Sequence, residues 1–415
     1  MLDLSELKII DAHIHRPERM TLSGSYEMWN SSFVDATLPH FDFDTKDEMQ
    51  TRLSKTFQEH LETLPRLTGL LNYVSRVYGC NPTLQDLDAV ISKNLRGEFS
   101  SYIRSVMDRE KIVTVVLDQS FLPDKPNGQP GDLLPDRYVW TYPIVRLIQP
   151  DWAENRGAKS IGEVLERIDD TIDLCVANGC SGLKSAVAYY RPLAIDRVEE
   201  DQADAALKSL LTSQPAGYIH FPAEIPRYDD SELTNARRLY QDYLLKYLYV
   251  KAGRVGLPLI IHTAVALHPA LSFKFNNPLG LYDIIQDDDI KRVETKFVLI
   301  HTGFPFHHYV ASMISQFPNV FADVSFFSQF PGILEETLRT FLQLAPSEKV
   351  MHGSDSDIVP EVMGYCASNI RQTLVKILND FESDYGWTEK NCLRAARNVM
   401  SENARRVFRI DNPQP

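Results

Sequence analysis

The chain has 415 residues, of which 44% are hydrophobic, so it can bury the core of one large domain or of two to three smaller ones. Its formal charge of -13 argues against a nucleic-acid partner, because phosphates require a basic surface. The five cysteines include no Cys-x-x-Cys pair, which argues against a thiolate zinc finger and favours reduced thiols.

Eight short, nearly continuous apolar runs predict parallel strands that are buried on both faces. Helical patterns separate many of these runs, and strand–helix alternation repeated this often favours an α/β barrel over separate domains. The predicted strands cover residues 8–15, 111–119, 140–147, 181–190, 257–264, 296–303, 320–327 and 349–355.

Four stretches between or after the strands carry helical patterns, over residues 160–178, 232–252, 360–379 and 388–406. The first opens with Ser160 and Glu163, which form a candidate capping box, and ends at Gly179. Pro360 suits the first turn of the third helix, where its missing N–H costs nothing.

Two long segments interrupt the alternation. Residues 16–110 look mainly helical and follow the first strand, and residues 191–255 follow the fourth. Insertions at these points would lie over the barrel mouth, where they can shape a substrate pocket. For residues 16–110 the alternative is a packed helical subdomain without substrate contact. We therefore expect one α/β domain over residues 1–415, with a helical cap and a second insertion.

Metal-binding side chains stand at the downstream ends of several predicted strands. In His13-Ile14-His15 the two imidazoles lie two residues apart, so in a strand they point to the same side and can reach one ion. On its own the motif is equally compatible with a structural or surface role. Its place at the end of an apolar strand favours a metal site.

His262 and His301 occur in matching contexts, LIIHT and VLIHT, each at the end of an apolar run. Asp355 follows Gly353 and Ser354 at the end of the last predicted strand, where a carboxylate can bind metal and carry a proton. Because a parallel barrel gathers its strand ends at one mouth, these residues together predict a metal site there.

Lys184 interrupts the fourth apolar strand, and a buried lysine without a partner would be costly. Carbamylation by carbon dioxide would turn its ammonium group into an anion with two oxygens, able to bridge two metal ions. The alternative is an unmodified lysine whose ammonium group forms a salt bridge or contacts substrate. Residue type alone favours this alternative.

The ordered set His13-x-His15, Lys184, His262, His301 and Asp355 resembles the amidohydrolase superfamily of metal-dependent TIM barrels. The phrases DAHIH, GLKSAVAYYR, LPLIIHT, FVLIHTGFPF, HGSDS and ENARRVF are most similar to the amidohydrolase-related branch. That branch includes amidohydrolase domains fused to glutamine-synthetase-like proteins. The resemblance covers the N-terminal strand and roughly residues 110–120 and 140–410, and it implies a (β/α)8 TIM barrel.

The resemblance also implies a binuclear metal centre, most often of zinc. His13 and His15 would bind the more buried ion, and His262 and His301 the more exposed one. Carboxylated Lys184 would bridge the two ions. Some members of the branch instead hold a single metal and use the histidine of strand six as a catalytic group, so the metal count and the role of His301 stay open.

The implied reaction is hydrolysis of an amide, ester or related C–N bond of a small molecule by a metal-activated hydroxide. Asp355 would bind the buried ion, take the proton of the attacking water and return it to the leaving group. Lys184 and His301 complete the catalytic set. The alternatives are a metal-dependent decarboxylase or other lyase, which a single ion would favour, and a noncatalytic metal-stabilised binding protein.

Candidate substrate contacts lie near two strand ends. Arg146, near the end of the third predicted strand, and Arg191, just beyond the fourth, could bind a carboxylate through bidentate contacts, with structural salt bridges as the equal alternative. Tyr190 is a third candidate. The chain shows no secretory leader pattern and no apolar stretch of the roughly 20 residues that span a membrane. We therefore expect a cytoplasmic enzyme that binds a small molecule, without a nucleic-acid or membrane partner, and a homo-oligomer stays open.

Overall fold

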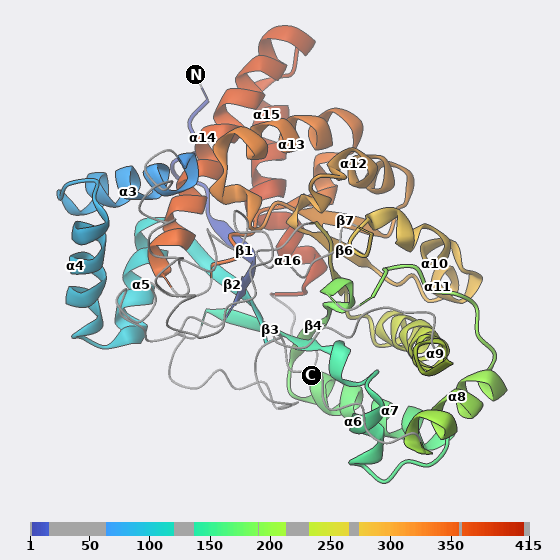
Figure 1. The fold of residues 1–415 in the computed structure, drawn as a ribbon. Coiled ribbons are helices and arrows are strands. Elements are labelled where there is room, and N and C mark those ends of the chain that lie inside the picture. The colour runs from blue at the N-terminus through green and yellow to red at the C-terminus, as the bar shows by residue number, and fades with distance from the viewer. Residues whose placement is uncertain are drawn as a thin grey trace.

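Eight parallel strands form one sheet in which neighbours follow the chain order from β1 to β8 (Figure 1). The computed structural model describes residues 2–15, 64–119, 137–189, 191–212, 232–264, 274–356 and 359–410. The strands are β1 (Ile9–His15), β2 (Ile112–Asp118), β3 (Tyr138–Pro143), β4 (Cys180–Ser185), β5 (Leu259–His262), β6 (Phe297–Ile300), β7 (Val320–Asp323) and β8 (Val350–Met351). Each of the eight predicted strands is present, and the predicted (β/α)8 barrel is confirmed.

The barrel closes between β8 and β1 through a loop rather than through a long strand ladder. Strand β8 has only two residues, and beyond it Ser356 forms an isolated parallel bridge with Ile14. The backbone N–H of Asp355 donates to the carbonyl of His13 at 2.9 Å, and the N–H of Ala12 donates to the carbonyl of His352 at 2.9 Å. The loop that carries Asp355 is therefore fixed to the strand that carries His13.

Helices follow the strands on the outside of the barrel (Figure 1). Those from β3 to β8 are α6 (Pro150–Glu154), α7 (Ile161–Ala177), α8 (Glu200–Thr212), α9 (Glu232–Val255), α10 (Tyr282–Gln286), α11 (Asp288–Arg292), α12 (His307–Gln316) and α13 (Pro331–Leu344). The chain continues after β8 through α14 (Pro360–Tyr385), α15 (Glu389–Arg397) and α16 (Asn403–Val407). None of the described helices combines the length and apolar character needed to cross a membrane.

The helices predicted over residues 160–178, 232–252 and 360–379 are present as α7, α9 and α14. The helix predicted over 388–406 is also present, as α15, a π-helical segment over Asn398–Glu402 and α16, which follow one another without a break. The Ser160 hydroxyl caps α7 by accepting from the N–H of Glu163 at 3.3 Å. The expected reciprocal bond is displaced by one residue, since the Glu163 carboxylate accepts from the N–H of Lys159 at 2.8 Å.

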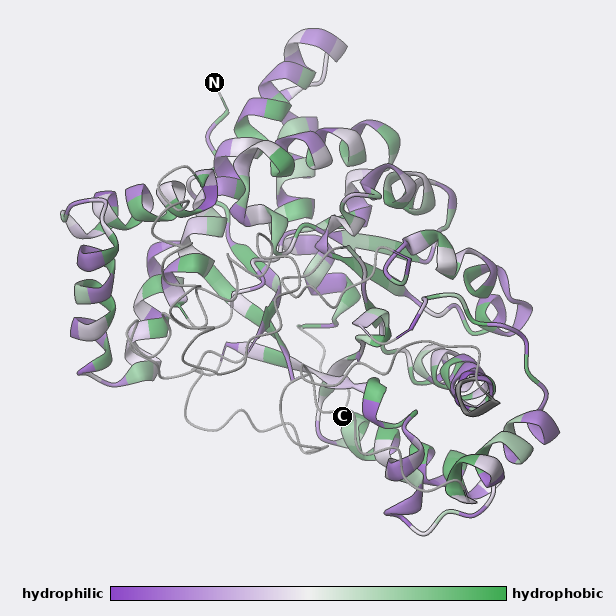
Figure 2. Ribbon diagram, in the orientation of Figure 1, coloured by the Kyte–Doolittle hydropathy of each residue, from purple (hydrophilic) through white to green (hydrophobic). Residues whose placement is uncertain are grey.

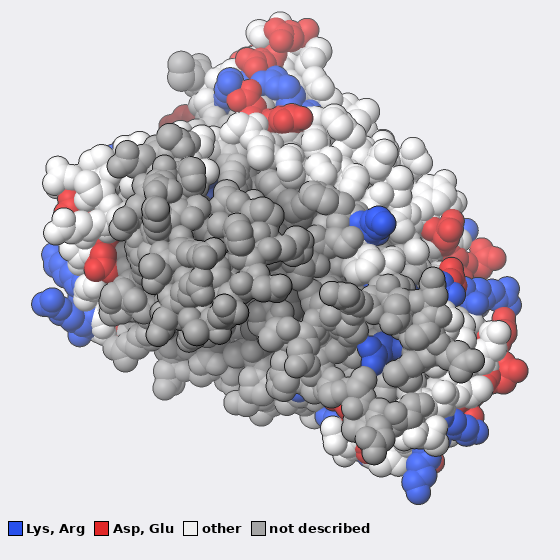
Figure 3. All heavy atoms as spheres, viewed as in Figure 1, with Lys and Arg blue, Asp and Glu red and all other residues white. Residues whose placement is uncertain are grey.

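The strands are apolar on both faces, and hydrophobic positions concentrate at the centre of the molecule (Figure 2). Val116 of β2, Ile260 of β5 and Val298 of β6 share one buried cluster with residues of α16, so they point into the barrel. Asp118 and His262 stand two residues further along β2 and β5 and therefore point the same way. Acidic and basic side chains lie next to one another on the outer helices (Figure 3).

The described part of residues 16–110 is helical, as expected, and residues 16–63 lie outside the described ranges. It comprises α3 (Pro65–Tyr78), α4 (Leu84–Leu95) and α5 (Phe99–Arg109). Helix α5 packs against β2 and α14, so it takes the place of the barrel helix between β1 and β2. Helices α3 and α4 share a second apolar cluster with the first turns of α14. Contact of this segment with substrate stays a prediction.

Helices α3 and α14 cross closely because each places a glycine against a tyrosine of the other. A Cβ atom on Gly69 would lie 2.1 Å from the Tyr365 hydroxyl, and one on Gly364 would lie 2.3 Å from the Tyr73 hydroxyl. The Tyr73 hydroxyl is also fixed, since it donates to Glu110 Oε1 at 2.8 Å and accepts from Arg109 Nη2 at 3.1 Å. Side chains larger than glycine therefore do not fit this crossing.

We expect Gly364→Ala to lower the free energy of unfolding by about 1–3 kcal/mol, because the added methyl group displaces Tyr73 from its hydrogen bonds. The matched control is Gly162→Ala in α7, where a Cβ atom would meet nothing within 4 Å. This control should be neutral or stabilising by about 0.4–1 kcal/mol. Urea unfolding of both variants measures the difference, and equal stabilities would show that the crossing tolerates a side chain.

Candidate metal centre

The four predicted histidine ligands form a row across the barrel mouth. The ring centroids of His15 and His13 are 5.1 Å apart, those of His13 and His301 are 5.3 Å apart, and those of His301 and His262 are 4.7 Å apart. His13 and His15 share one side of β1, as the two-residue spacing predicts. The structure thus brings together imidazoles from β1, β5 and the end of β6.

His301 reaches this row through a break in the backbone. Ile300 is the last residue of β6, and its side chain belongs to the interior cluster, so the next residue of a regular strand would point outward. His301 instead has a φ of 63°, in the left-handed region. Its backbone N–H donates to Asp323 Oδ1 at 2.9 Å, which fixes this turn.

Asp355 meets the two histidines of β1 from across the β8–β1 closure. Its Oδ1 lies 3.2 Å from Nε2 of His13 and 3.3 Å from Nε2 of His15. Burial alone would raise the pKa of Asp355, but His301, His13 and His15 hold this pKa well below its ordinary value. The carboxylate is therefore ionised and lies where two imidazole nitrogens converge.

Four strand ends at the mouth carry non-glycine residues with left-handed backbone conformations. The φ angles are 75° at Ala264, 63° and 59° at the adjacent His301 and Thr302, 61° at Phe326 and 59° at Asp355. Such conformations cost on the order of 1 kcal/mol or more each and tend to gather at functional sites. Two of the five residues, His301 and Asp355, are predicted metal ligands.

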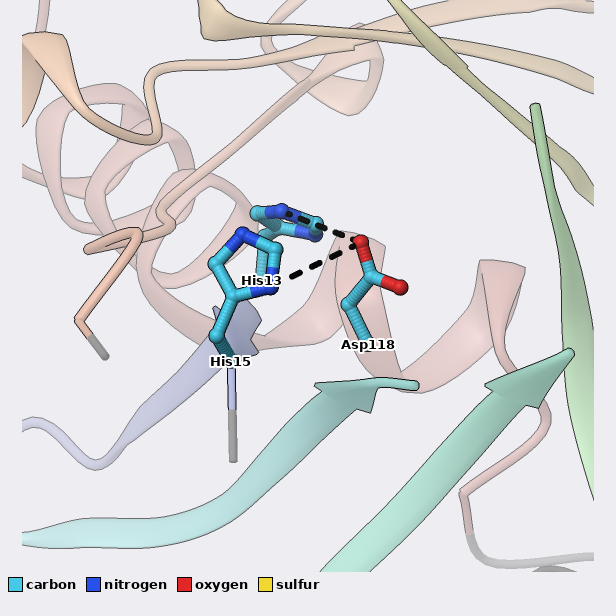
Figure 4. Close-up of side chains that lie close together, drawn as sticks. All are labelled: His13, His15 and Asp118. Atoms are coloured by element: carbon cyan, nitrogen blue, oxygen red, sulfur yellow. Dashed lines mark ion pairs between the residues drawn. The ribbon is translucent and has the colours of Figure 1, made fainter. Parts of the chain in front are cut away.

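Asp118, which was not among the predicted ligands, is a central member of the site (Figure 4). It is the last residue of β2, and its Oδ2 lies 3.7 Å from His13 Nε2 and 4.0 Å from His15 Nδ1. The sequence carried a signal for it, since Asp118 ends an apolar strand like the other ligands. Its strand was located correctly, over residues 111–119, but Asp118 was not singled out within it.

Lys184 forms a buried ion pair with Asp118. Its Nζ donates to Asp118 Oδ2 at 2.7 Å and lies 3.4 Å from His13 Nε2. Burial would raise the pKa of Asp118, but the Lys184 ammonium and the two β1 histidines hold it below its ordinary value. This contact corresponds to the salt-bridge alternative for Lys184.

A hydrogen-bond relay fixes the ring of His301. Asp323 Oδ1 accepts from the backbone N–H groups of His301 and Ser325, and it also accepts from the Ser325 hydroxyl at 2.6 Å. The Ser325 hydroxyl has a single proton, which it donates to Asp323. Its oxygen lies 2.8 Å from His301 Nδ1 and therefore accepts a hydrogen bond from the ring. His301 therefore carries its proton on Nδ1 and presents the lone pair of Nε2 to the row of histidines.

These residues fit a divalent metal ion by the chemistry of their donors. Potential ligand atoms lie within 4.8 Å of one another in two groups that share His13, one with His15 and Asp118 and one with His301 and Asp355. Burial lowers the pKa of His301 to about 3 and that of His262 well below its ordinary value, so both rings are neutral at pH 7. Nε2 of His262 is buried and makes no hydrogen bond. Imidazole nitrogens and carboxylate oxygens together suit zinc and similar ions.

Two of the three predicted substrate contacts, Arg146 and Arg191, lie within the described residues. Arg191 is buried, forms an ion pair with Asp242, and donates from Nη2 to the carbonyl of Ala194 at 2.9 Å. Arg146 ends a short 3₁₀ turn directly after β3 and is half-buried. Tyr190 lies outside the described residues. Substrate binding by these three residues stays a prediction.

Comparisons with solved structures show which proteins share this fold. Over its full length, the chain superposes on a Lactobacillus casei protein that is proposed to be a metal-dependent hydrolase, with a TM-score of 0.73, 16% identity and 100% of both chains covered. A uronate isomerase from Thermotoga maritima matches with a TM-score of 0.68 and 12% identity, over 97% of this chain and 95% of that one. At these identities the likeness concerns the fold alone.

One curated relative and a family model extend the comparison to sequence. Protein fluG of Emericella nidulans is 23% identical over 243 residues, which make up 56% of this chain and 26% of that protein, so the match spans about a quarter of its length. The amidohydrolase family model matches residues 181–410, which include four of the six predicted ligands and more than half of the chain. With its parallel barrel and its histidine and aspartate cluster, the chain belongs to the amidohydrolase family.

Proposed function

We propose that the protein is a metal-dependent hydrolase that cleaves an amide, ester or related C–N bond of a small molecule. The observation that carries the proposal is the convergence of Asp355 Oδ1 on His13 and His15, at 3.2 and 3.3 Å. This carboxylate combines metal-ligand chemistry with the proton transfer that hydrolysis requires, whereas the carboxylate of Asp118 is already paired with the Lys184 ammonium group.

His13, His15 and Asp355 would hold a divalent ion, with His301 or Asp118 as a further ligand. When bound, such an ion lowers the pKa of a water molecule and polarises a carbonyl group. Asp355 accepts the proton of the attacking water, because its low pKa keeps it ionised beforehand. It then returns this proton to the departing amine or alkoxide. The Asp323–Ser325 relay keeps His301 in one tautomer and orientation throughout.

The ion pair between Lys184 and Asp118 supports an unmodified lysine. Without a bridging carbamate the row would hold one ion, which is the count that favours the second candidate below. A carbamate on Nζ would replace a cation that lies 2.7 Å from Asp118 Oδ2 with an anion. Two buried anions at such a distance repel each other unless a second cation separates them. The two-zinc centre bridged by carboxylated Lys184, which the family resemblance implies, therefore requires Asp118 to exchange its partner.

A second candidate is a metal-dependent decarboxylase or another reaction without net hydrolysis. The specific observation in its favour is the buried Lys184 ammonium, because a cation beside the metal ligands can also bind a substrate carboxylate. Uronate isomerases share the fold with this chain and carry out such nonhydrolytic chemistry. The two candidates differ in whether a water oxygen enters the product.

One experiment separates them. The zinc-loaded protein is incubated in ¹⁸O-labelled water with a panel of N-acyl amino acids, dipeptides, lactones and aromatic carboxylates, and the products are identified by mass spectrometry. Incorporation of ¹⁸O into a new acid supports hydrolysis. Release of carbon dioxide, or an isomer without ¹⁸O incorporation at the reacting carbon, supports the second candidate instead.

We expect Asp355→Asn to fold and to retain some metal while turnover falls by about 10²–10⁴-fold, because the amide cannot accept the proton of water. Circular dichroism and metal analysis check the fold and the ion. The control is Asp384→Asn on the exposed end of α14, which should behave like the parent protein. Turnover of Asp355→Asn close to that of the control would remove Asp355 from the mechanism.

Native mass spectrometry of the protein loaded with zinc in bicarbonate buffer should show no mass of bound carbon dioxide, because Asp118 already balances the charge of the Lys184 ammonium group and Lys184 stays unmodified. Removal of the ion proposed for the row of histidines with a chelator should abolish turnover, and added zinc should restore it. The added mass of one bound carbon dioxide would establish the bridged centre instead.

Ser325→Ala should reduce turnover or metal affinity by about 10–100-fold, because the ring of His301 loses the acceptor that fixes its tautomer. The control is Ser328→Ala, which removes a buried hydroxyl of the same loop that donates to the carbonyl of Gly353 and does not touch a histidine. ¹⁵N NMR of labelled histidines in the metal-free protein reads the tautomer directly. An unchanged His301 spectrum in Ser325→Ala would contradict the relay.

A further inference from the structure

A second group of metal-ligating side chains lies outside the catalytic row, on the outer side of the barrel. His307 and His308 begin α12, and Glu336 lies in the second turn of α13. Their potential ligand atoms lie within 4.8 Å of one another, and Nε2 of His307 is 3.4 Å from Glu336 Oε1. The proposed catalytic mechanism uses none of these three residues.

His307 is the member of this group that points to a ligand. It is only 6% exposed, and its ring nitrogens have no well-aligned hydrogen-bond partner, since Nε2 meets Glu336 Oε1 only at 3.4 Å. One face of its ring stacks on Phe304, with the two planes 6° apart, and the His308 ring centroid is 4.4 Å away. A buried imidazole whose nitrogens are only weakly hydrogen-bonded is unfavourable, because these nitrogens lost their hydrogen bonds to water on folding. A metal ion is a partner that would satisfy one of them.

The charges around the group are suited to a divalent cation. The start of α12 is the positive end of a helix dipole, which opposes a cation there. Glu336 offsets this effect, because it brings an anionic oxygen from the neighbouring helix. Burial and the neighbouring His308 lower the pKa of His307, so its ring is neutral and keeps a lone pair for a ligand bond.

We infer that His307, His308 and Glu336 form a second metal site, distinct from the catalytic row and selective for Zn²⁺ over Mg²⁺ and Ca²⁺. Two imidazole nitrogens and one carboxylate oxygen are the donors of zinc sites, whereas magnesium and calcium prefer oxygen ligands alone. Exposed His308 and Glu336 leave room for water as a fourth ligand.

An ion at this site links α12 to α13 at the rim of the barrel. Phe304, which stacks on His307, also contacts Phe327, with a distance of 4.8 Å between ring centroids. Phe304 and Phe327 belong to the loops that follow His301 and Asp323, respectively. The site therefore holds together the two loops that contain the His301 relay, and its role is structural rather than chemical.

The test counts ions in the full-length protein. The parent and two variants, His308→Ala and Glu336→Gln, are dialysed to equilibrium against micromolar Zn²⁺, and bound zinc per chain is measured by plasma mass spectrometry. We expect each variant to bind one ion fewer than the parent while the catalytic ions remain. The test compares the number of bound ions in each variant with that in the parent. It therefore works whether the catalytic centre binds one ion or two, and whatever reaction the protein catalyses.

The matched control is Glu335→Gln, which changes the adjacent carboxylate, already engaged by Arg339 and Lys376. This control should bind as many ions as the parent. A zinc-dependent rise in melting temperature should likewise be present in the parent and in Glu335→Gln and absent from the other two variants. An unchanged ion count in His308→Ala and Glu336→Gln would overturn the site, as would an equal loss in the Glu335→Gln control.

Discussion

The site depends above all on how the barrel closes between β8 and β1. The carboxylate of Asp11 accepts from the N–H of Ser354 at 2.8 Å, and the N–H of Asp355 donates to the carbonyl of His13 at 2.9 Å. These bonds fix a loop to a strand that is more than 300 residues distant in sequence. Because β8 itself is short, the same few bonds both complete the barrel and place Asp355 against His13 and His15.

Charge balance is the second constraint on the mouth of the barrel. Asp118, Lys184 and Asp355 are buried or nearly so, and each has an oppositely charged or titratable neighbour within 4 Å. Breaking such a pair on one side leaves an uncompensated charge, which is far more costly than losing an exposed pair. A bound cation adds its charge to this network of paired groups. The number of bound ions and the form of Lys184, free ammonium or carbamate, therefore depend on each other.

The fold and most of the site could be predicted from the sequence, because buried parallel strands leave long apolar runs and their final residues meet at one edge. His13, His15, His262, His301 and Asp355 were predicted in this way, and the structure brings them together; metal binding by them stays a prediction. Asp118 was missed although it ends an apolar strand like the other ligands, because its pairing with Lys184 is a contact between distant segments that no local pattern indicates. The relay through Ser325 was also invisible, since it depends on a left-handed turn at His301 that no local pattern indicates.

The left-handed backbone conformations at four strand ends affect which substitutions would stabilise this protein. Glycine would relieve the strain at each of these positions, yet the chain keeps Ala264, His301, Phe326 and Asp355. His301 and Asp355 carry donor atoms, and Ala264 and Phe326 belong to a small apolar cluster beside them. The backbone is thus strained at positions whose side chains form the barrel mouth. Variants selected only for thermal stability would therefore tend to acquire glycine at these positions, where the chemistry takes place.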